Sequence, residues 1–190
     1  MQGRIAAIVG VSVVAMNTPA SANPLKSLYT TIEFKTCTKS ASAPGRQAWL
    51  CPGLAGYPVY IAIANKRTYV SVGPQPEKRR AAGQTLGAGN SLFPKQSSRA
   101  TLEWRFVKRE GKVLPYATIQ RYFTEEEGRP GEVIVVTRVT PTEDCHVAHI
   151  DAIANPEAIA LARAVADRDA RAFDCVASPK RIGVTGPSPK

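Results

Sequence analysis

Two histidines in the C-terminal part of the chain have the residue types of a metal site. His146 and His149 follow Cys145 in the run Cys145-His146-x-x-His149, and imidazole and thiolate are ligands that zinc prefers. On a β-strand, neighbouring side chains alternate between faces, so we expect the two histidines to point apart. Cys145 and His149 share a face, but four residues of strand separate them by about 13 Å. We therefore expect no metal and no cofactor.

The other reactive side chains lack the sequence context that catalysis needs. Asp144 and Asp151 flank the histidines, but the chain has no Gly-x-Ser-x-Gly turn for a nucleophilic serine. The three glutamates 125–127 share one polar connection, where nothing separates a general acid from a general base. The glycine-rich run 83–91 lacks the Gly-Lys-Ser/Thr of a phosphate-binding loop. We expect a protein that is not an enzyme.

The four cysteines form an even set, which in an exported chain predicts disulfides. Cys37 ends one expected strand and Cys51 precedes the next. Cys145 lies on the last expected strand, and Cys175 directly follows the one expected helix. Of the three possible connectivities, this local order favours Cys37–Cys51 and Cys145–Cys175, each worth about 3 kcal/mol in the chain-entropy account.

Basic and aromatic side chains alternate along several expected strands. A sheet face that mixes tyrosine and arginine can bind anionic or carbohydrate ligands, although a solvated face has the same composition, and both interpretations stay open. The excess of basic residues, 25 against 15 acidic, favours an anionic partner. The candidate ligand-binding residues are Arg105, Tyr116, Arg121, Tyr122 and Arg138.

One carboxylate conflicts with the pattern of the expected helix. At about 100° per residue, Asp169 falls on the apolar face beside Ala162 and Val165. A carboxylate placed there needs a partner. Arg121 shares its strand face with apolar residues that would meet the helix. We expect a structural ion pair between Asp169 and Arg121, or an Asp169–Tyr contact, that holds the helix to the sheet.

The elements that position these residues are mostly strands. Alternation of apolar and polar residues predicts strands over 27–36, 58–64, 68–73, 102–107, 113–123, 132–140 and 144–151. Asn155 as N-cap and Pro156 at the first position begin an amphipathic helix over 157–173. Residues 74–98 form a long irregular stretch. The fold class is α+β, mainly β: an antiparallel meander sheet, or a partly closed barrel, covered by one C-terminal helix.

The N-terminus has the three-part layout of an export signal. Arg4 precedes an apolar run over 5–15, and Ala20-Ser21-Ala22 offers the small residues of a cleavage site. We expect residues 1–22 to be a signal peptide cut after Ala22, with an uncleaved anchor as the alternative. Residues 23–176 then form a single β-rich domain, and 177–190 a disordered basic, proline-rich tail. No transmembrane segment is expected after signal removal, because no later stretch is long and apolar enough.

Several stretches are similar to a group of short exported proteins of Gram-negative bacteria that have no assigned function. The resemblance implies placement in the periplasm and transfers no catalytic residue. The stretches that carry it are Cys145-His146-Val147-Ala148, Asn155-Pro156-Glu157-Ala158, Phe173-Asp174-Cys175, Trp104-Arg105-Phe106 and Pro115-Tyr116-Ala117-Thr118.

These observations together favour a non-enzymatic envelope-associated protein, periplasmic or secreted. It would bind an anionic envelope polymer or another envelope protein through its basic and aromatic sheet face, and export makes nucleic acid an unexpected partner. A periplasmic protein like the small β-barrel lysozyme inhibitors is the first alternative, but a strongly basic chain would repel basic lysozymes. An uncharacterised hydrolase is the second alternative.

Overall fold

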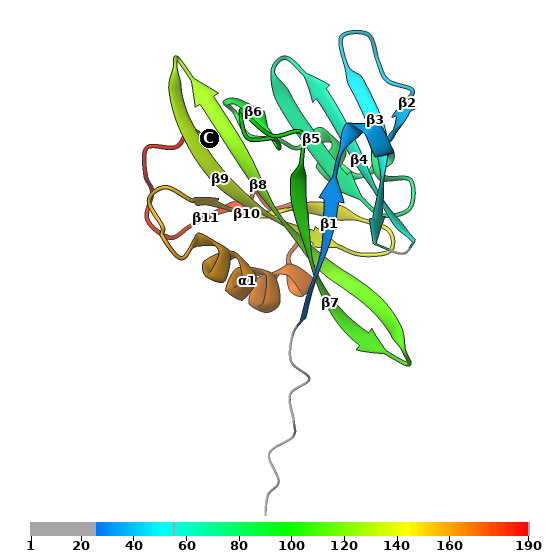
Figure 1. Ribbon diagram of the computed structural model, residues 1–190. Coiled ribbons are helices and arrows are strands. Elements are labelled where there is room, and N and C mark those ends of the chain that lie inside the picture. The colour runs from blue at the N-terminus through cyan, green and yellow to red at the C-terminus, as the bar shows by residue number, and fades with distance from the viewer. Residues whose placement is uncertain (1–25, 55, 190) are drawn as a thin grey trace, which may run out of the picture.

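The structure of the protein is a computed structural model that describes residues 26–54 and 56–189 (Figure 1). The signal peptide expected over 1–22 and its cleavage site lie outside the described residues. The strands are β1 (Lys26–Ile32), β2 (Thr38–Ser40), β3 (Gln47–Leu54), β4 (Tyr57–Ala64), β5 (Arg67–Val72), β6 (Gly89–Ser91), β7 (Ala100–Arg109), β8 (Lys112–Glu126), β9 (Arg129–Val139), β10 (Asp144–Asp151) and β11 (Lys180–Ile182).

The strands form two sheets that do not close on themselves. The larger sheet has the order β1-β7-β8-β9-β10-β11, with β6 pairing β8, and the smaller sheet has the order β2-β3-β4-β5. One helix, α1 (Ala158–Asp169), follows β10, and the 3₁₀ helices are η1 (Phe34–Thr36), η2 (Pro76–Lys78), η3 (Arg80–Gly83) and η4 (Ala170–Ala172). A mainly β fold with antiparallel sheets and one C-terminal helix is therefore confirmed.

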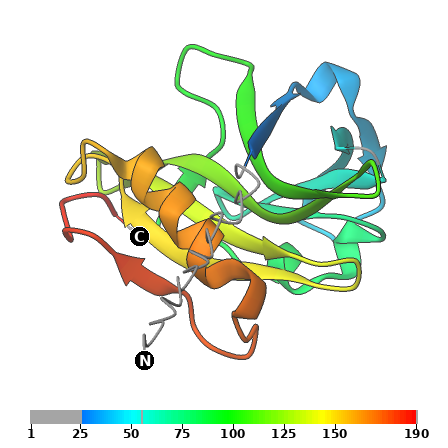
Figure 2. The same ribbon diagram turned by 90° about the horizontal axis from the view of Figure 1, so that it is seen from below.

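The larger sheet is the middle of three layers. Helix α1 covers one of its faces and the smaller sheet packs against the other (Figures 1 and 2). The run from Val133 to Val136 on β9 explains this arrangement, because all four side chains are buried and they alternate between the two cores. A strand covered on both faces reads as a continuous apolar run.

Two β-bulges change which side chains share a face. On β8, Ala117 pairs with Arg105 of β7 and Pro115 pairs with the next residue, Phe106. Tyr116, which lies between Pro115 and Ala117, is therefore an extra residue. On β10, His146 pairs with Thr137 and Ala148 with Val136, so Val147 is extra. Each extra residue reverses the alternation beyond it.

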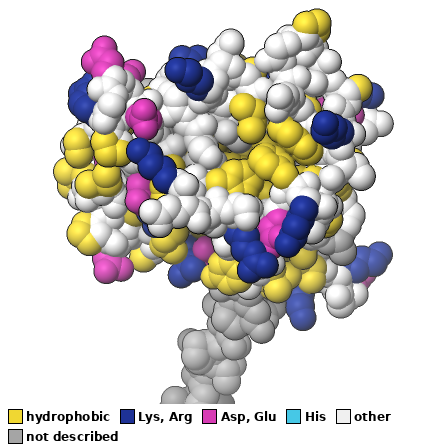
Figure 3. Space-filling view, turned by 45° about the horizontal axis from the view of Figure 1, so that its top comes forward, with side chains coloured by type: hydrophobic (Ala, Val, Ile, Leu, Met, Phe, Trp, Pro, Cys, Tyr) yellow, Lys and Arg dark blue, Asp and Glu magenta, His cyan; other side chains and the backbone are white. Residues whose placement is uncertain are grey.

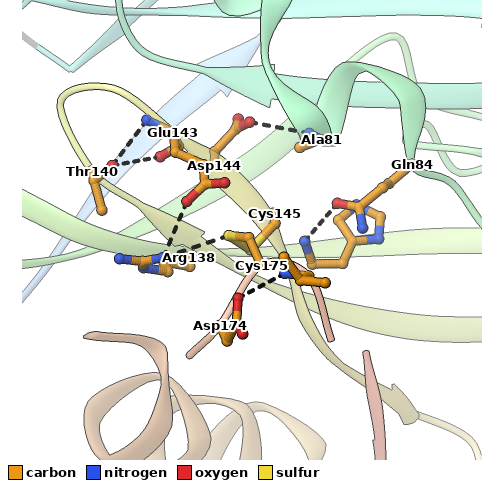
Figure 4. The surroundings of a disulfide bond; sticks show 11 residues. Ala81, Gln84, Arg138, Thr140, Glu143, Asp144, Cys145, Asp174 and Cys175 are labelled. Atoms are coloured by element: carbon orange, nitrogen blue, oxygen red, sulfur yellow. Dashed lines mark hydrogen bonds and ion pairs between the residues drawn. A yellow bond between two sulfur atoms is a disulfide. The ribbon is translucent and has the colours of Figure 1, made fainter. Parts of the chain in front are cut away.

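Both expected disulfides are confirmed. Cys37 and Cys51 join η1 to β3, with their Cα atoms 4.2 Å apart. Cys145 on β10 joins Cys175, with their Cα atoms 5.7 Å apart, and so ties the segment after the helix to the sheet (Figure 4). No described helix is long and apolar enough to cross a membrane.

The expectation of a disordered tail is wrong for the described part of 177–190. Strand β11 pairs in parallel with β10, and Ser188 is buried. Ser188 donates its backbone N–H and its hydroxyl to the carboxylate of Asp151, at 2.9 and 2.8 Å. The tail also passes directly over Gly131, where a Cβ would lie 2.6 Å from Pro189. Specific hydrogen bonds thus order a segment whose composition alone predicts disorder.

Candidate ligand cleft

A seam of charged residues joins α1 to β7 and β8. Glu103 and Arg105 lie on the same face of β7 and are buried. Arg163 of α1 donates from Nε and Nη2 to Glu103, at 2.7 and 3.1 Å. One turn further along α1, Asp167 accepts from Arg105 and from the hydroxyl of Tyr116. In the first pair the helix carries the base and the sheet the acid, and in the second pair the order is reversed. Because a shifted helix would bring like charges together, the two pairs fix the register of the helix on the sheet.

The pKa values in this seam follow from its burial. Burial disfavours the charge of Arg105, yet its hydrogen bonds to Asp167 raise the pKa of the guanidinium above its usual value. Burial and the neighbouring carboxylate of Asp167 together raise the pKa of the Tyr116 phenol. Arg105 therefore stays charged and Tyr116 stays neutral, as a hydrogen-bonded anchor requires.

The ion pair expected between Asp169 and Arg121 is wrong. Asp169 is the last residue of α1, and its carboxylate pairs with its neighbour Arg168 at 2.6 Å. Arg121 pairs instead with Glu132 on the adjacent strand β9. The carboxylate that anchors the helix is Asp167, which bonds to Arg105 and Tyr116 of the sheet from the side of the helix that its apolar pattern leaves polar.

The five candidate binding residues do not form one exposed face. Arg105 and Tyr116 meet at Asp167 and are buried. Tyr122 faces the core between the two sheets, because the bulge at Tyr116 separates the faces of the two tyrosines. Arg138 lies at the second disulfide, where it pairs with Glu143 (Figure 4). Of the five, Arg121 lines a pocket.

That pocket is a cleft of about 380 Å³ on the helix-bearing face of the larger sheet, beside the start of α1. Ile119 and Phe123 of β8 contribute to it, and Ile159 and Arg163 of α1 also line it. The remaining lining residues come from β1, β7, β8 and the segment that joins β6 to β7: Tyr29, Leu92, Pro94, Arg99, Ala100, Thr101, Glu103, Gln120 and Arg121.

The cleft opens at a break in the sheet. The pairing of β7 with β8 begins at Gln120, and the pairing of β6 with β8 ends at Phe123, so Arg121 and Tyr122 have no partner on that side in either ladder. The Gln120 side chain donates to the carbonyl of Arg121 at 2.8 Å. Its other atom, Oε1, is buried and has no hydrogen-bond partner among the described residues. A polar acceptor is thus left unsatisfied beside the cleft.

The side chains that line the cleft include more bases than acids. Arg99, Arg121 and Arg163 line it, against the single acid Glu103. Each guanidinium is held by a carboxylate: Arg99 by Glu33 at 2.5 Å, and the others as described above. Figure 3 shows basic and acidic side chains interspersed on the face that it displays, with no single basic field.

The two histidines lie close together, which corrects the expectation that they point apart. The bulge at Val147 brings them to one face, where His146 Nδ1 lies 3.2 Å from His149 Nε2. Burial, and then the neighbouring His149, lower the pKa of His146 to about 3. The described residues contain no group of three or more potential metal ligands. The pair is therefore neutral at His146 and too small a ligand set for a structural zinc.

Comparisons with family models, with curated proteins and with solved structures find no match to this chain. The two disulfides fit a protein that folds in an oxidising compartment.

Proposed function

We propose that the protein is exported, with cleavage after Ala22, and acts in the periplasm or outside the cell as a non-enzymatic binding protein. Its ligand is an anionic envelope component with an apolar portion, and it binds in the cleft beside α1. The observation that carries this proposal is the ring of three arginines around a partly apolar cleft of about 380 Å³. This site replaces the sheet face expected from the sequence.

The arginines are suited to binding because they are already positioned. A guanidinium has five N–H donors, and a carboxylate behind it uses only some of them. The pairs Arg99–Glu33, Arg121–Glu132 and Arg163–Glu103 fix the three side chains while leaving donors for a ligand. Donors held in place lose little conformational entropy when they bind.

The apolar residues of the cleft select for an amphipathic ligand. Ile119, Phe123 and Ile159 all line the cleft. Contact with an acyl chain or a sugar face would bury these side chains further, at about 25 cal/mol for each Å² removed from water. A phosphate or carboxylate headgroup would then meet the arginines at the rim.

The cleft is better suited to binding than to catalysis. Its single acid, Glu103, is already bonded to Arg163 and to the hydroxyl of Ser27. A general acid or base needs freedom to exchange a proton with its substrate. Among the residues that line the cleft, none forms a nucleophile and base pair.

The test is a titration of the mature protein with lipopolysaccharide micelles and with peptidoglycan fragments, followed by calorimetry at low and high salt. Arg121→Gln should weaken binding by about tenfold, and added salt should weaken the binding of the unmodified protein. Arg129→Gln is the matched control, because it removes the same charge from the first residue of β9, outside the cleft. Equal affinity of the two variants, or no binding to either ligand, would overturn the proposal.

A further inference from the structure

A second pocket lies away from the cleft, between β5, the segment after η3 and the histidines of β10. Its volume is about 410 Å³. No aspartate or glutamate lines it. The residues that line it are Arg67, Tyr69, Gly83, Gln84, Thr85, Leu86, Gly87, His146, His149 and Pro179.

Arg67 is the unusual residue of this pocket. It is half-buried at the start of β5, and it forms no ion pair, side-chain hydrogen bond or ring contact with any other residue among 26–54 and 56–189. Every other described arginine that is buried or half-buried has such a partner: Arg46, Arg79, Arg105, Arg121, Arg138 and Arg163. A guanidinium removed from part of its water without a counter-charge is a site prepared for an anion.

The side chains around Arg67 can supply further hydrogen bonds. Tyr69 lies two residues along β5 and therefore on the same face, so its hydroxyl can act with the guanidinium. His149 is half-buried at the pocket, and Arg181 of β11 is its register partner. The surroundings of the pocket are thus rich in donors and cations.

The histidine pair makes His149 a suitable donor. His146 is 1% exposed, and its Nε2 has no hydrogen-bond partner among the described residues. A buried imidazole without a counter-charge remains neutral, so its Nδ1 can accept a hydrogen bond from the N–H at Nε2 of His149 across the 3.2 Å contact. His146 then acts as a positioning residue that holds the His149 ring at the pocket.

We propose that this pocket binds an oxyanion, a phosphoryl or a carboxylate group, with Arg67 as its counter-charge and Tyr69 and His149 as hydrogen-bond donors. The site is separate from the cleft beside α1 and does not depend on the function proposed for that cleft. A free anion or a charged group on a larger ligand would present the same chemistry to Arg67.

The competing interpretation is a metal ion between the histidines. Two nitrogens on a tetrahedral zinc, at about 2.0–2.1 Å from the metal, lie about 3.3 Å apart, which is close to the spacing of this pair. Arg67 disfavours a metal ion, because its unpaired guanidinium repels a cation. No lining acid offsets that repulsion. The charge of the pocket therefore favours an anion.

The experiment titrates the mature protein with inorganic phosphate and, separately, with acetate, while NMR follows the ring signals of His146 and His149. Saturable shifts with phosphate, acetate or both are expected, and the comparison of the two tells which oxyanion the site prefers. Arg67→Gln should weaken the affinity for the preferred anion by at least about tenfold. Arg67→Lys, which keeps the charge, should recover part of it.

Arg109→Gln is the matched control, because Arg109 is exposed on the hairpin between β7 and β8 and forms no ion pair with a described residue. It should bind the anion as the unmodified protein does. Should Arg67→Gln fail to fold, Tyr69→Phe and Arg67→Lys, measured as separate variants, should each weaken the affinity for the preferred anion. Unchanged affinity in Arg67→Gln, or saturable shifts with zinc and none with either anion, would overturn the proposal.

Discussion

The carboxylate of Asp167 accepts hydrogen bonds from Nε and Nη2 of Arg105, at 2.9 and 2.7 Å. This pair joins the last turn of α1 to β7 in two parallel bonds, the geometry in which an arginine binds a carboxylate best. The Arg105 side chain is 7% exposed and that of Asp167 21% exposed, so water screens the pair only in part. The helix is therefore attached to the sheet by charge as well as by its apolar face.

Asp167→Asn should lower the free energy of unfolding by about 2–4 kcal/mol, because it leaves the buried guanidinium of Arg105 without its main counter-charge. Urea denaturation followed by circular dichroism measures this change. Asp169→Asn is the control, because Asp169 pairs only with its neighbour Arg168, whose side chain is 69% exposed. Its expected effect is within about 0.5 kcal/mol. A larger loss in the control than in Asp167→Asn would refute the anchoring role.

The second disulfide closes the longer loop and should contribute more stability than the first. Cys145 and Cys175 are 30 residues apart, and Cys37 and Cys51 are 14 apart. Removing each pair as a double serine variant should cost about 4 and about 3 kcal/mol respectively. Thermal and urea unfolding of both variants, with and without a reductant, measures the order. Equal unfolding curves for the 145/175 variant and the unmodified protein would contradict the prediction.

Local pattern was enough to predict most of the strands and both disulfides. The hairpin of β4 and β5 follows from alternation on both sides of Asn65 and Lys66, whose φ angles of 50° and 59° fit a tight turn. The pairing of Cys145 with Cys175 follows because the helix returns the chain to the last long strand. These features depend on residues close together in the sequence.

The faces of the strands could not be predicted beyond the bulges. Tyr116 and Val147 are single extra residues, and nothing in their residue types marks them as bulged. Each reverses the alternation that places later side chains, so the histidines meet and the tyrosines separate. The cleft was missed for a related reason: it opens where β6 and β7 leave two residues of β8 unpaired, and this gap depends on long-range pairing.

Tertiary contacts also override local signals at the start of the helix and in the smaller sheet. Asn155 was expected to cap α1, but its side chain bonds instead to the backbone of Val184 in the tail, and the helix begins at Ala158. The strands β2 and β3 were not predicted, because their irregular sequence gains its structure from pairing: β3 pairs with β4, and β2 pairs with β3. The structure of such segments is therefore set by the residues that they contact in the folded protein.

Asp151 at the end of β10 should stabilise the protein at neutral pH through the tail. Burial opposes its charge, but hydrogen bonds from Ser188, Ala154 and Ile153 outweigh burial and hold the pKa of the carboxyl below its ordinary value of 3.8. A depressed pKa gives stability above the unfolded value, which is lost as the pH falls through the folded value. Ser188→Ala should therefore cost about 1 kcal/mol at pH 7 and less below about pH 4.

Urea denaturation over this pH range measures the effect, and Ser178→Ala is the control because Ser178 is exposed and forms no hydrogen bond with a described residue. The backbone amide at position 188, which donates to Asp151, should also exchange faster with solvent in the Ser188→Ala protein than in the control. An equal loss at both ends of the pH range would show that the hydroxyl acts independently of the Asp151 charge.

Asp144 at the other end of β10 should have the opposite pH dependence. Its buried carboxyl bridges the two sheets, because the backbone N–H groups of Val72 on β5 and of Ala81 in η3 donate to it and the Ser71 hydroxyl of β5 lies 2.8 Å from it (Figure 4 shows the Ala81 contact). Burial outweighs these bonds and raises the pKa of Asp144 from 3.8 to about 6. Ser71 supports a protonated carboxyl, because its single hydroxyl proton cannot serve both Asp144 and the carbonyl of Pro76, at 2.8 and 2.6 Å.

Between pH 3.8 and about 6 the folded protein holds a proton on Asp144 that the unfolded chain releases, so stability from this group falls as the pH rises through that window. The fall is about 2–3 kcal/mol and is complete above the folded pKa. Asp144→Asn removes the titrating group, so its unfolding free energy should lack this slope, whereas Glu143→Gln, at a half-buried neighbouring carboxylate that pairs with Arg138, should retain it. Carbon-13 NMR of the Asp144 carboxyl gives the midpoint directly, and a midpoint near pH 4 would mean that the hydrogen bonds from β5 and η3, rather than burial, set its charge.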